Sequence, residues 1–266
     1  MMLDKIIECE KAYRKNFGDT YEYAGFTRFR DEGMKDMYSH NFTFMLGNDG
    51  EFTSAEIVKL VEGEIAYRKQ EGADYCQLNF HMPVGDDVVG LINPRPEVER
   101  LRFYYIDTAD CGFEKDIRVK KLECESQIED IFNIAYAEDG DDLGEDFCRN
   151  RANRQAEVYL SAGGVNAYIL YVDGVAVAKC EFFIYPQAEH AAFAKIEDFV
   201  VLPSHQRMGY GSAMLRHLIA TAKEDGVRIT YLQTDYDGTA HEMYTKFGFS
   251  AVSDGYEVVE FLFQGI

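Results

Sequence analysis

The residues best suited to chemistry lie together in the C-terminal half, where a strand, a loop and a helix follow one another. Residues 196–215 read IEDFVVLPSHQRMGYGSAML. An apolar run predicts a strand over 193–202, Pro203 stops it, and Gly209 and Gly211 precede a predicted helix over 211–224. A helix N-terminus carries unpaired N–H groups and partial positive charge, and glycines let an anion approach the backbone closely. The segment therefore predicts a binding site for a phosphate or diphosphate.

This segment resembles the acetyl-CoA signature of the GNAT family of N-acetyltransferases, Gln/Arg-x-x-Gly-x-Gly/Ala, at residues 206–211. A second stretch, residues 237–249, is similar to the family's Asn-x-x-Ala-x-x-x-Tyr-x-Lys-x-Gly-Phe. The two motifs occur in the family's order, and the resemblance covers about residues 116–266. The glycine segment at residues 206–211 lacks the Gly-Lys-Ser/Thr of a P-loop and has too few glycines for a dinucleotide fingerprint.

The resemblance implies acetyl-CoA as cosubstrate. Main-chain groups of the strand would bind the pantetheine arm and polarise the thioester carbonyl, and amides of the loop would hold the diphosphate. Asp237 stands where the family usually has asparagine, so it could accept a hydrogen bond from pantetheine but could not donate one. The implied cofactor-binding residues are Phe199, Val200, Val201, Gln206, Arg207, Met208, Gly209, Tyr210, Gly211, Ser212 and Asp237.

The resemblance also implies two catalytic groups. Tyr244 matches the tyrosine that protonates the departing CoA thiolate; alternatively it is a packed aromatic side chain. Glu197 or Asp198 would act as general base on the incoming ammonium, directly or through water. Neighbouring strand residues point to opposite faces, so we expect only one of them in the cleft and favour Glu197, the alternative being a structural carboxylate.

The order of the predicted strands and helices indicates an α/β (α+β) fold, and the resemblance implies a GNAT-type mixed, mostly antiparallel sheet flanked by helices. The second half predicts strands at 117–120, 165–172, 175–184, 193–202, 230–234, 249–252 and 256–263 and helices at 127–137, 145–160, 211–224 and 239–246. The first half predicts helices at 3–16 and after Thr53 or Ser54, and strands at 21–29, 38–46, 75–81 and 101–106. Asp173-Gly174 predicts a tight hairpin, and Gly72 and Gly226 end helices.

A repeat links the two halves. Residues 65, 66, 69, 72 and 78 recur as identical types 154 positions later, in a helix–glycine–strand pattern. We therefore divide the chain into an N-terminal domain, 1–115, interpreted as a degenerate GNAT-like copy, and an acetyltransferase domain, 116–266. The first copy has residues 49–54, DGEFTS, where the second has its glycine loop, so only the second is expected to bind CoA.

The charge balance bears on partners. The chain has 47 acidic and 27 basic residues, a formal net charge of −20, which disfavours nucleic acid and anionic membranes and favours a small-molecule amine or a basic peptide. Alternatively the acid serves solubility alone. The acidic run 138–146 is expected as a loop between two helices, at the rim that borders the acceptor in the family.

The six histidines show no ligand spacing and the acidic run does not fit a calcium loop, so no metal is expected. The six cysteines are scattered, and no signal peptide or membrane helix is evident, which favours the cytoplasm. The sequence thus predicts an acetyl-CoA-dependent N-acetyltransferase that transfers acetyl directly to a primary amine. The alternative is a non-catalytic CoA-binding regulatory protein.

Overall fold

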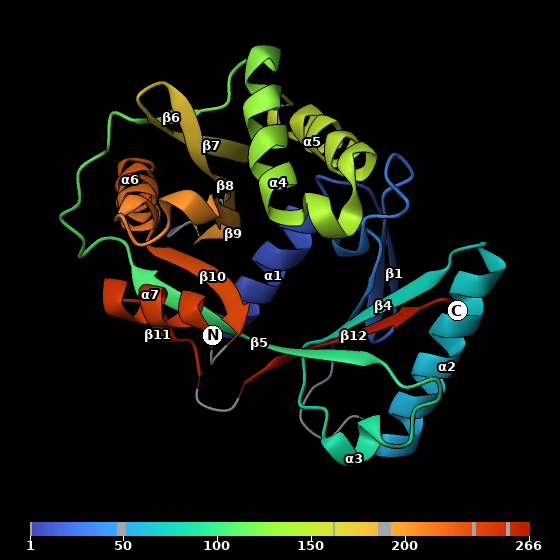
Figure 1. The fold of residues 1–266 in the computed structure, drawn as a ribbon. Coiled ribbons are helices and arrows are strands. Elements are labelled where there is room, and N and C mark those ends of the chain that lie inside the picture. The colour runs from blue at the N-terminus through green and yellow to red at the C-terminus, as the bar shows by residue number, and fades with distance from the viewer. Residues whose placement is uncertain (1, 47–51, 162, 186–192, 236–237, 254–255) are drawn as a thin grey trace. The chain divides into compact units, whose positions relative to one another are not determined.

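Figure 1 shows the protein as a computed structural model, which describes residues 2–46, 52–161, 163–185, 193–235, 238–253 and 256–266. The residues group into two units. Unit 1 comprises Met1–Asn16, Tyr104–Gln233 and Tyr244–Ser250, and unit 2 comprises Phe17–Phe103, Thr234–Met243 and Ala251–Ile266. This division differs from the expected boundary at residues 115/116, because an N-terminal helix joins unit 1 and a C-terminal strand joins unit 2.

Unit 1 is built on a sheet whose strands follow the order β10-β9-β8-β7-β6. The pairs are antiparallel except β9 and β10, which are parallel. Its strands are β6 (Val119–Lys121), β7 (Val165–Val172), β8 (Val175–Tyr185), β9 (Phe193–Val201) and β10 (Ile229–Asp235). The predicted hairpin is confirmed: Asp173 and Gly174 have φ of 50° and 82°, the double left-handed turn that Asp-Gly favours.

Helices cover both faces of this sheet. On one face lie α1 (Met2–Arg14) and α4 (Ile128–Leu143), which contact β8 and β9, and α5 (Glu145–Tyr159), which contacts β7. On the other face α6 (Tyr210–Glu224) places His217 against Tyr168 of β7, with ring centroids 5.6 Å apart. Shorter helical segments are η2 (Glu125–Gln127), η3 (Pro203–His205) and α7 (Thr239–Phe247).

The acidic run 138–146 is not the expected loop. Its first residues continue α4 to Leu143, and Glu145 begins α5. Gly144, with φ of 80°, forms the joint between the two helices. Carboxylates of this run are therefore held on helices in fixed directions, which a loop would not impose.

Unit 2 has a sheet in the order β1-β2-β3-β4-β12-β5. Its strands are β1 (Asp19–Tyr23), β2 (Phe26–Arg30), β3 (Thr43–Met45), β4 (Tyr75–Phe80), β5 (Glu97–Asp107), whose last residues belong to unit 1, and β12 (Val258–Gln264). The expected single strand 21–29 is instead a hairpin turning at Gly25, with φ of 87°. The two strands expected at 249–252 and 256–263 are present, but in different places of the sheet: β11 (Ser250–Ala251) pairs with β5, whereas β12 lies between β4 and β5.

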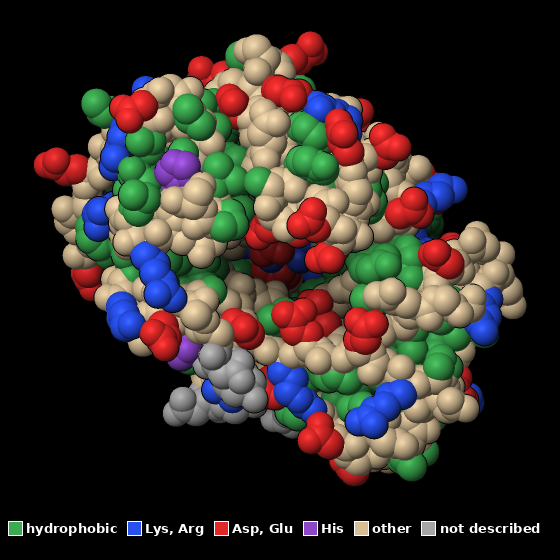
Figure 2. Space-filling model, in the orientation of Figure 1, with side chains coloured by type: hydrophobic (Ala, Val, Ile, Leu, Met, Phe, Trp, Pro, Cys, Tyr) green, Lys and Arg blue, Asp and Glu red, His purple; other side chains and the backbone are tan. Residues whose placement is uncertain are grey.

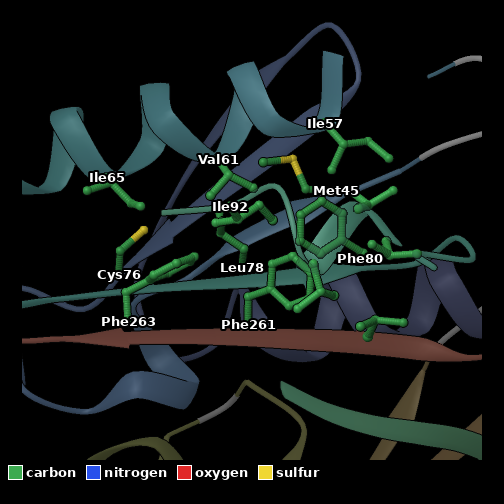
Figure 3. Close-up of a cluster of buried hydrophobic side chains, with 14 of the residues drawn as sticks. Met45, Ile57, Val61, Ile65, Cys76, Leu78, Phe80, Ile92, Phe261 and Phe263 are labelled. Atoms are coloured by element: carbon green, nitrogen blue, oxygen red, sulfur yellow. The ribbon is translucent and has the colours of Figure 1, made fainter. Parts of the chain in front are cut away.

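The core of unit 2 lies between this sheet and α2 (Ser54–Gln70), as Figure 3 shows. Ile57, Val61 and Ile65 project from the helix onto Leu78 and Phe261 of the central strands. Each buried aliphatic or aromatic side chain of this kind contributes about 1.5–3 kcal/mol. A short helix, α3 (Asp86–Val89), closes the cluster, and η1 (Tyr38–His40) precedes β3.

The repeated residues occupy equivalent places in the two units. The segment β3–α2–β4 and the segment β9–α6–β10 each join parallel strands through a helix. Gly72 and Gly226 follow the helices with φ of 75° and 74°, and each helix ends with the same pair of backbone hydrogen bonds. The local geometry thus agrees with the repeat in the sequence.

Candidate active site

Strand β9 contains a bulge at the predicted site. Glu197 pairs with Glu181 of β8, and Val200 pairs with Lys179. Between these pairs β8 has one residue and β9 has two, Asp198 and Phe199. Asp198 has φ of 49°, an uncommon conformation for a residue other than glycine, and such bulges redirect side chains. The bulge overturns the expectation that Glu197 and Asp198 point to opposite faces of the sheet, because Glu197 bonds to α1 and Asp198 to α5 on the same face.

The bulge adjoins the place where β9 parts from β10. Their parallel register runs from Phe193 with Ile229 to Ile196 with Leu232, although β9 continues to Val201. The main chain of residues 199–201 therefore lies beyond the last registered pair, as pantetheine binding would require. One carbonyl there is already used, because Gln206 Nε2 donates to Val201 O at 3.1 Å.

The loop after β9 ends at an uncapped helix. Arg207 and Gly209 have φ of 61° and 85°. Gly209 is the N-cap of α6, and no side chain caps the helix. Its first-turn amides, from Tyr210 to Ser212, are therefore open to an anion. A Cβ at Gly209 would have no atom within 4 Å, so there is space beside the backbone for phosphate oxygens; Met208 is exposed and Gly211 is buried.

Tyr244 lies beside the open part of β9. Its side chain is 6% exposed, and its ring meets that of Phe199 edge-on with centroids 6.3 Å apart. In the described part of the chain no residue exchanges a hydrogen bond with its hydroxyl. Burial raises the pKa of the phenol above its ordinary value, which keeps the proton on the oxygen. The structure thus brings Tyr244 and the strand together, with the hydroxyl available as a donor.

Glu197 is held by two cations. Its Oε1 accepts from Arg14 of α1 at 3.0 Å, and its Oε2 lies 3.0 Å from Lys195 Nζ. Burial alone would raise the pKa of Glu197, but Lys195 and Arg14 outweigh it and hold the pKa of Glu197 below its ordinary value. The carboxylate is ionised at neutral pH but is a weaker base than an ordinary glutamate.

Asp198 has a similar environment. It pairs with Lys179 and accepts from Gln155 Nε2 at 3.2 Å. Burial opposes ionisation, but these two partners and Arg151 hold the pKa of Asp198 below its ordinary value. Both expected base candidates are therefore tied into ion pairs.

The surrounding polar cluster was not predicted. Glu10 of α1 bonds Lys195 through both carboxylate oxygens at 2.6 Å and accepts from Tyr231 at 2.9 Å. Tyr13, Tyr159 and Gln155 all donate to the buried Glu181. Burial raises the pKa of Glu181 to about 7, with a further increase from Asp198.

A sequence signal for this cluster existed. In the apolar strands β8 and β9, Lys179 and Glu181, and Lys195 and Glu197, stand two residues apart and so on one face. Charged residues at alternate positions of otherwise apolar strands indicate a buried ionic layer. Their partners on α1 carried no comparable signal, because nothing linked the N-terminal helix to unit 1.

Asp237, the remaining predicted contact, lies outside the described residues. Within the described ranges no group of side chains could hold a metal ion. A separate pocket of about 310 Å³ lies in unit 2, lined by Tyr38, Gln77, Glu97, Val98, Glu99, Glu260 and Leu262. None of the predicted site residues lines it.

Comparison with known proteins agrees with the fold. Residues 127–249 match the model of the acetyltransferase (GNAT) family. A functionally unknown conserved protein from Staphylococcus epidermidis shares the fold at a TM-score of 0.73 and 16% identity, covering 94% of this chain and 95% of its own. A GCN5-related N-acetyltransferase from Kribbella flavida aligns at 0.63 and 14% identity, covering 96% and 93%.

A tandem GNAT protein from the clavulanic acid biosynthesis pathway aligns at 0.50 and 9% identity, covering 85% of this chain and 75% of its own. No curated protein matches in sequence. The family match and the mixed, mostly antiparallel sheet confirm the resemblance for residues 127–249, which match the GNAT acetyltransferase model. Among the described residues no helix is long and apolar enough to cross a membrane.

Proposed function

We propose that the protein is an acetyl-CoA-dependent N-acetyltransferase that transfers an acetyl group directly to a primary amine, carried by a small molecule or a basic peptide. The observation that carries the proposal is the uncapped N-terminus of α6 after the open end of β9, with the Tyr244 ring against Phe199. The family and fold support acetyl transfer in general.

The cofactor site follows from the open backbone. Amides from Arg207 to Ser212 would bind the diphosphate, which the positive end of α6 favours. Main-chain groups of Phe199, Val200 and Val201 would bind the pantetheine arm. The Gln206 side chain already donates to the Val201 carbonyl. Gln206 would therefore support the loop, and Val201 would contact the pantetheine arm through main-chain groups other than this hydrogen bond.

The chemistry then needs two proton movements. The amine nitrogen attacks the thioester carbon, a main-chain N–H stabilises the oxyanion, and the C–S bond breaks as Tyr244 gives its proton to the leaving sulfur. The amine loses its proton to Glu197 or Asp198. Because both carboxylates are weak bases, we propose that a water takes the proton from the amine and passes it to one of them. Of the two, Glu197 is the carboxylate whose charge acts on Tyr244.

One acyl-CoA should bind per chain. The helix in unit 2 that corresponds to α6 is α2, and its N-terminus is closed by its own side chains. Thr53 accepts from the Glu56 amide at 3.3 Å, and Glu56 accepts from the Thr53 amide at 2.7 Å. The Glu56 carboxylate occupies the place of an anion and would repel phosphate. Native mass spectrometry with excess acetyl-CoA should show a single bound molecule; a second one would mean that unit 2 has its own site.

Acetyl-CoA turnover against a panel of amines tests the activity. Release of free CoA, together with the acetylated product in the mass spectrum, would support the proposal. If acetyl-CoA binds but no amine in a broad panel of small amines and basic peptides is acetylated, the proposed activity is wrong. Binding without turnover would favour a CoA-binding regulatory protein, an alternative that the ion-paired Glu197 and Asp198 would suit.

Two further assignments accompany this proposal. The shared strand–helix–strand geometry supports an N-terminal half derived from a GNAT-like copy that has no phosphate loop. All six cysteines are unpaired, four of them buried, which supports a reducing compartment such as the cytoplasm.

A further inference from the structure

The ion pairs near the bulge share an asymmetry in exposure. The Asp198 side chain is 24% exposed and that of its partner Lys179 is 2% exposed. The Asp139 side chain is 31% exposed and that of Arg151 is 10% exposed. Glu197 follows the same rule, at 25% against 11% or less for its two cations. A solute that approaches this face of unit 1 therefore meets carboxylates first, with the cations beneath them.

Glu138 adds a carboxylate without a counter-ion. It lies on α4 next to Asp139, and its side chain is exposed. Nowhere in the described ranges does it form a hydrogen bond or an ion pair. Although the residue as a whole is exposed, the atoms around its carboxyl group partly desolvate it and raise the pKa of Glu138 to about 7; Lys179 and Arg151 lower this pKa, and Asp139 and Asp198 raise it. Figure 2 shows acidic side chains gathered over α4 and α5, so the neighbourhood favours a cation.

Gln155 provides independent evidence for a missing donor. It is 3% exposed, and its Nε2 donates to Glu181 and Asp198. Its Oε1 is buried and has no hydrogen-bond partner in the described structure. A buried acceptor without a donor costs about 1–3 kcal/mol. An N–H donor beside Asp198, direct or through water, would satisfy this oxygen.

We propose that the acceptor is a small amine with a second ammonium group, and that this second group binds Glu138. The reacting amine then lies on the β9 side, near Asp198 and the neighbouring Phe199, where the thioester is proposed to bind. This inference rests on the proposed acetyl transfer. It narrows the acceptor class, because Asp198 already pairs with Lys179, whereas the reacting amine at the thioester cannot also neutralise Glu138, which would need a second ammonium.

Three acceptors of matched length test the proposal: 1,4-diaminobutane, n-butylamine and 4-aminobutanoate. They share a four-carbon chain with an amine at one end, and their far ends are positive, neutral and negative. With the unmodified protein, kcat/KM should be highest for the diamine, by about tenfold or more over butylamine, and lowest for the aminobutanoate. Glu138→Gln should remove about tenfold from kcat/KM for the diamine and leave butylamine nearly unchanged.

A matched control keeps the charge loss but not the position. Glu157→Gln changes a glutamate of α5 that is 67% exposed and paired with Arg154. Glu157 stands two residues from Gln155 and therefore on the opposite side of α5. This variant should behave as the unmodified protein does. Acetyl-CoA affinity, measured by calorimetry, should be equal in all three proteins and so reports intact folding.

Each result decides the matter. Equal kcat/KM for the three acceptors would overturn the inference while leaving acetyl transfer in place. The same holds for a Glu138→Gln variant whose kcat/KM falls by the same factor for all three acceptors. If none is acetylated, the proposed function fails for this class, and calorimetry with 1,4-diaminobutane decides on the site alone. Binding that Glu138→Gln abolishes supports it, and no binding overturns it.

Discussion

Replacing Tyr244 with phenylalanine should lower kcat by roughly 10²–10⁴-fold, because the change removes the proposed proton donor to the CoA thiolate. The side chain is 6% exposed and packs by its ring on Phe199 and Phe249, and these contacts survive the loss of the hydroxyl. The Kd for acetyl-CoA and the Tm should therefore stay close to those of the unmodified protein. Steady-state kinetics with calorimetry and thermal unfolding measure all three quantities.

Tyr168→Phe is a suitable control for this change. Tyr168 is also buried in unit 1, at 7% exposure, but it packs on Phe182 and His217 beside α6. Its variant should keep full kcat. A Tyr244→Phe protein with unchanged kcat would assign the proton donation to water or another group. A large decrease in the Tm of the Tyr244→Phe protein would instead indicate that the Tyr244 hydroxyl has a structural role.

The second large effect is expected at Gly209. Gly209→Ala should weaken acetyl-CoA binding by about tenfold or more, because the new Cβ would stand in the space where phosphate oxygens approach the amides of α6. The same change costs about 1–2 kcal/mol of stability, since φ at this position is left-handed. Calorimetric titration gives the Kd, and denaturant unfolding gives the free energy of unfolding.

Gly226→Ala separates the two effects. Gly226 has φ of 74°, is exposed, and has no atom within 4 Å of its added Cβ, as at Gly209. It follows the C-terminal end of α6, away from the proposed phosphates. We expect the same loss of stability there and no loss of affinity. Equal affinities in both variants would show that the loop does not bind the cofactor.

Local signals in the sequence were sufficient to predict the glycine loop, the Asp173 hairpin and a helix cap at Thr53 or Ser54, of which the structure has Thr53. In each case the residue type itself dictates the backbone conformation or supplies the cap. These features depend on a few neighbouring residues, so a single sequence is enough to find them.

The environment of the carboxylates depended on distant residues and was not predicted. The alternation rule gave Glu197 and Asp198 opposite faces, but an inserted residue in β9 placed both on one face. The cations that hold Glu197 come partly from α1, which is 183 residues away at Arg14. The sequence pattern suggested a boundary at 115/116. It carries no information on which strand a distant strand will join, so it did not indicate that residues 1–16 group with unit 1 and residues 251–266 with unit 2.

The place of β12 has a consequence for synthesis of the chain. Phe261 pairs with Leu78 on one side and with Val98 on the other, so the inner strand of unit 2 leaves the ribosome long after its neighbours. Until then β4 and β5 each have an unpaired edge, and Phe80 lacks the ring of Phe261, whose centroid is 4.8 Å away in the finished fold. Such edges attract other strands. The emerging chain therefore exposes these two edges for as long as unit 1 is being made, and a nascent chain halted before Val258 should be degraded readily by protease throughout residues 17–103.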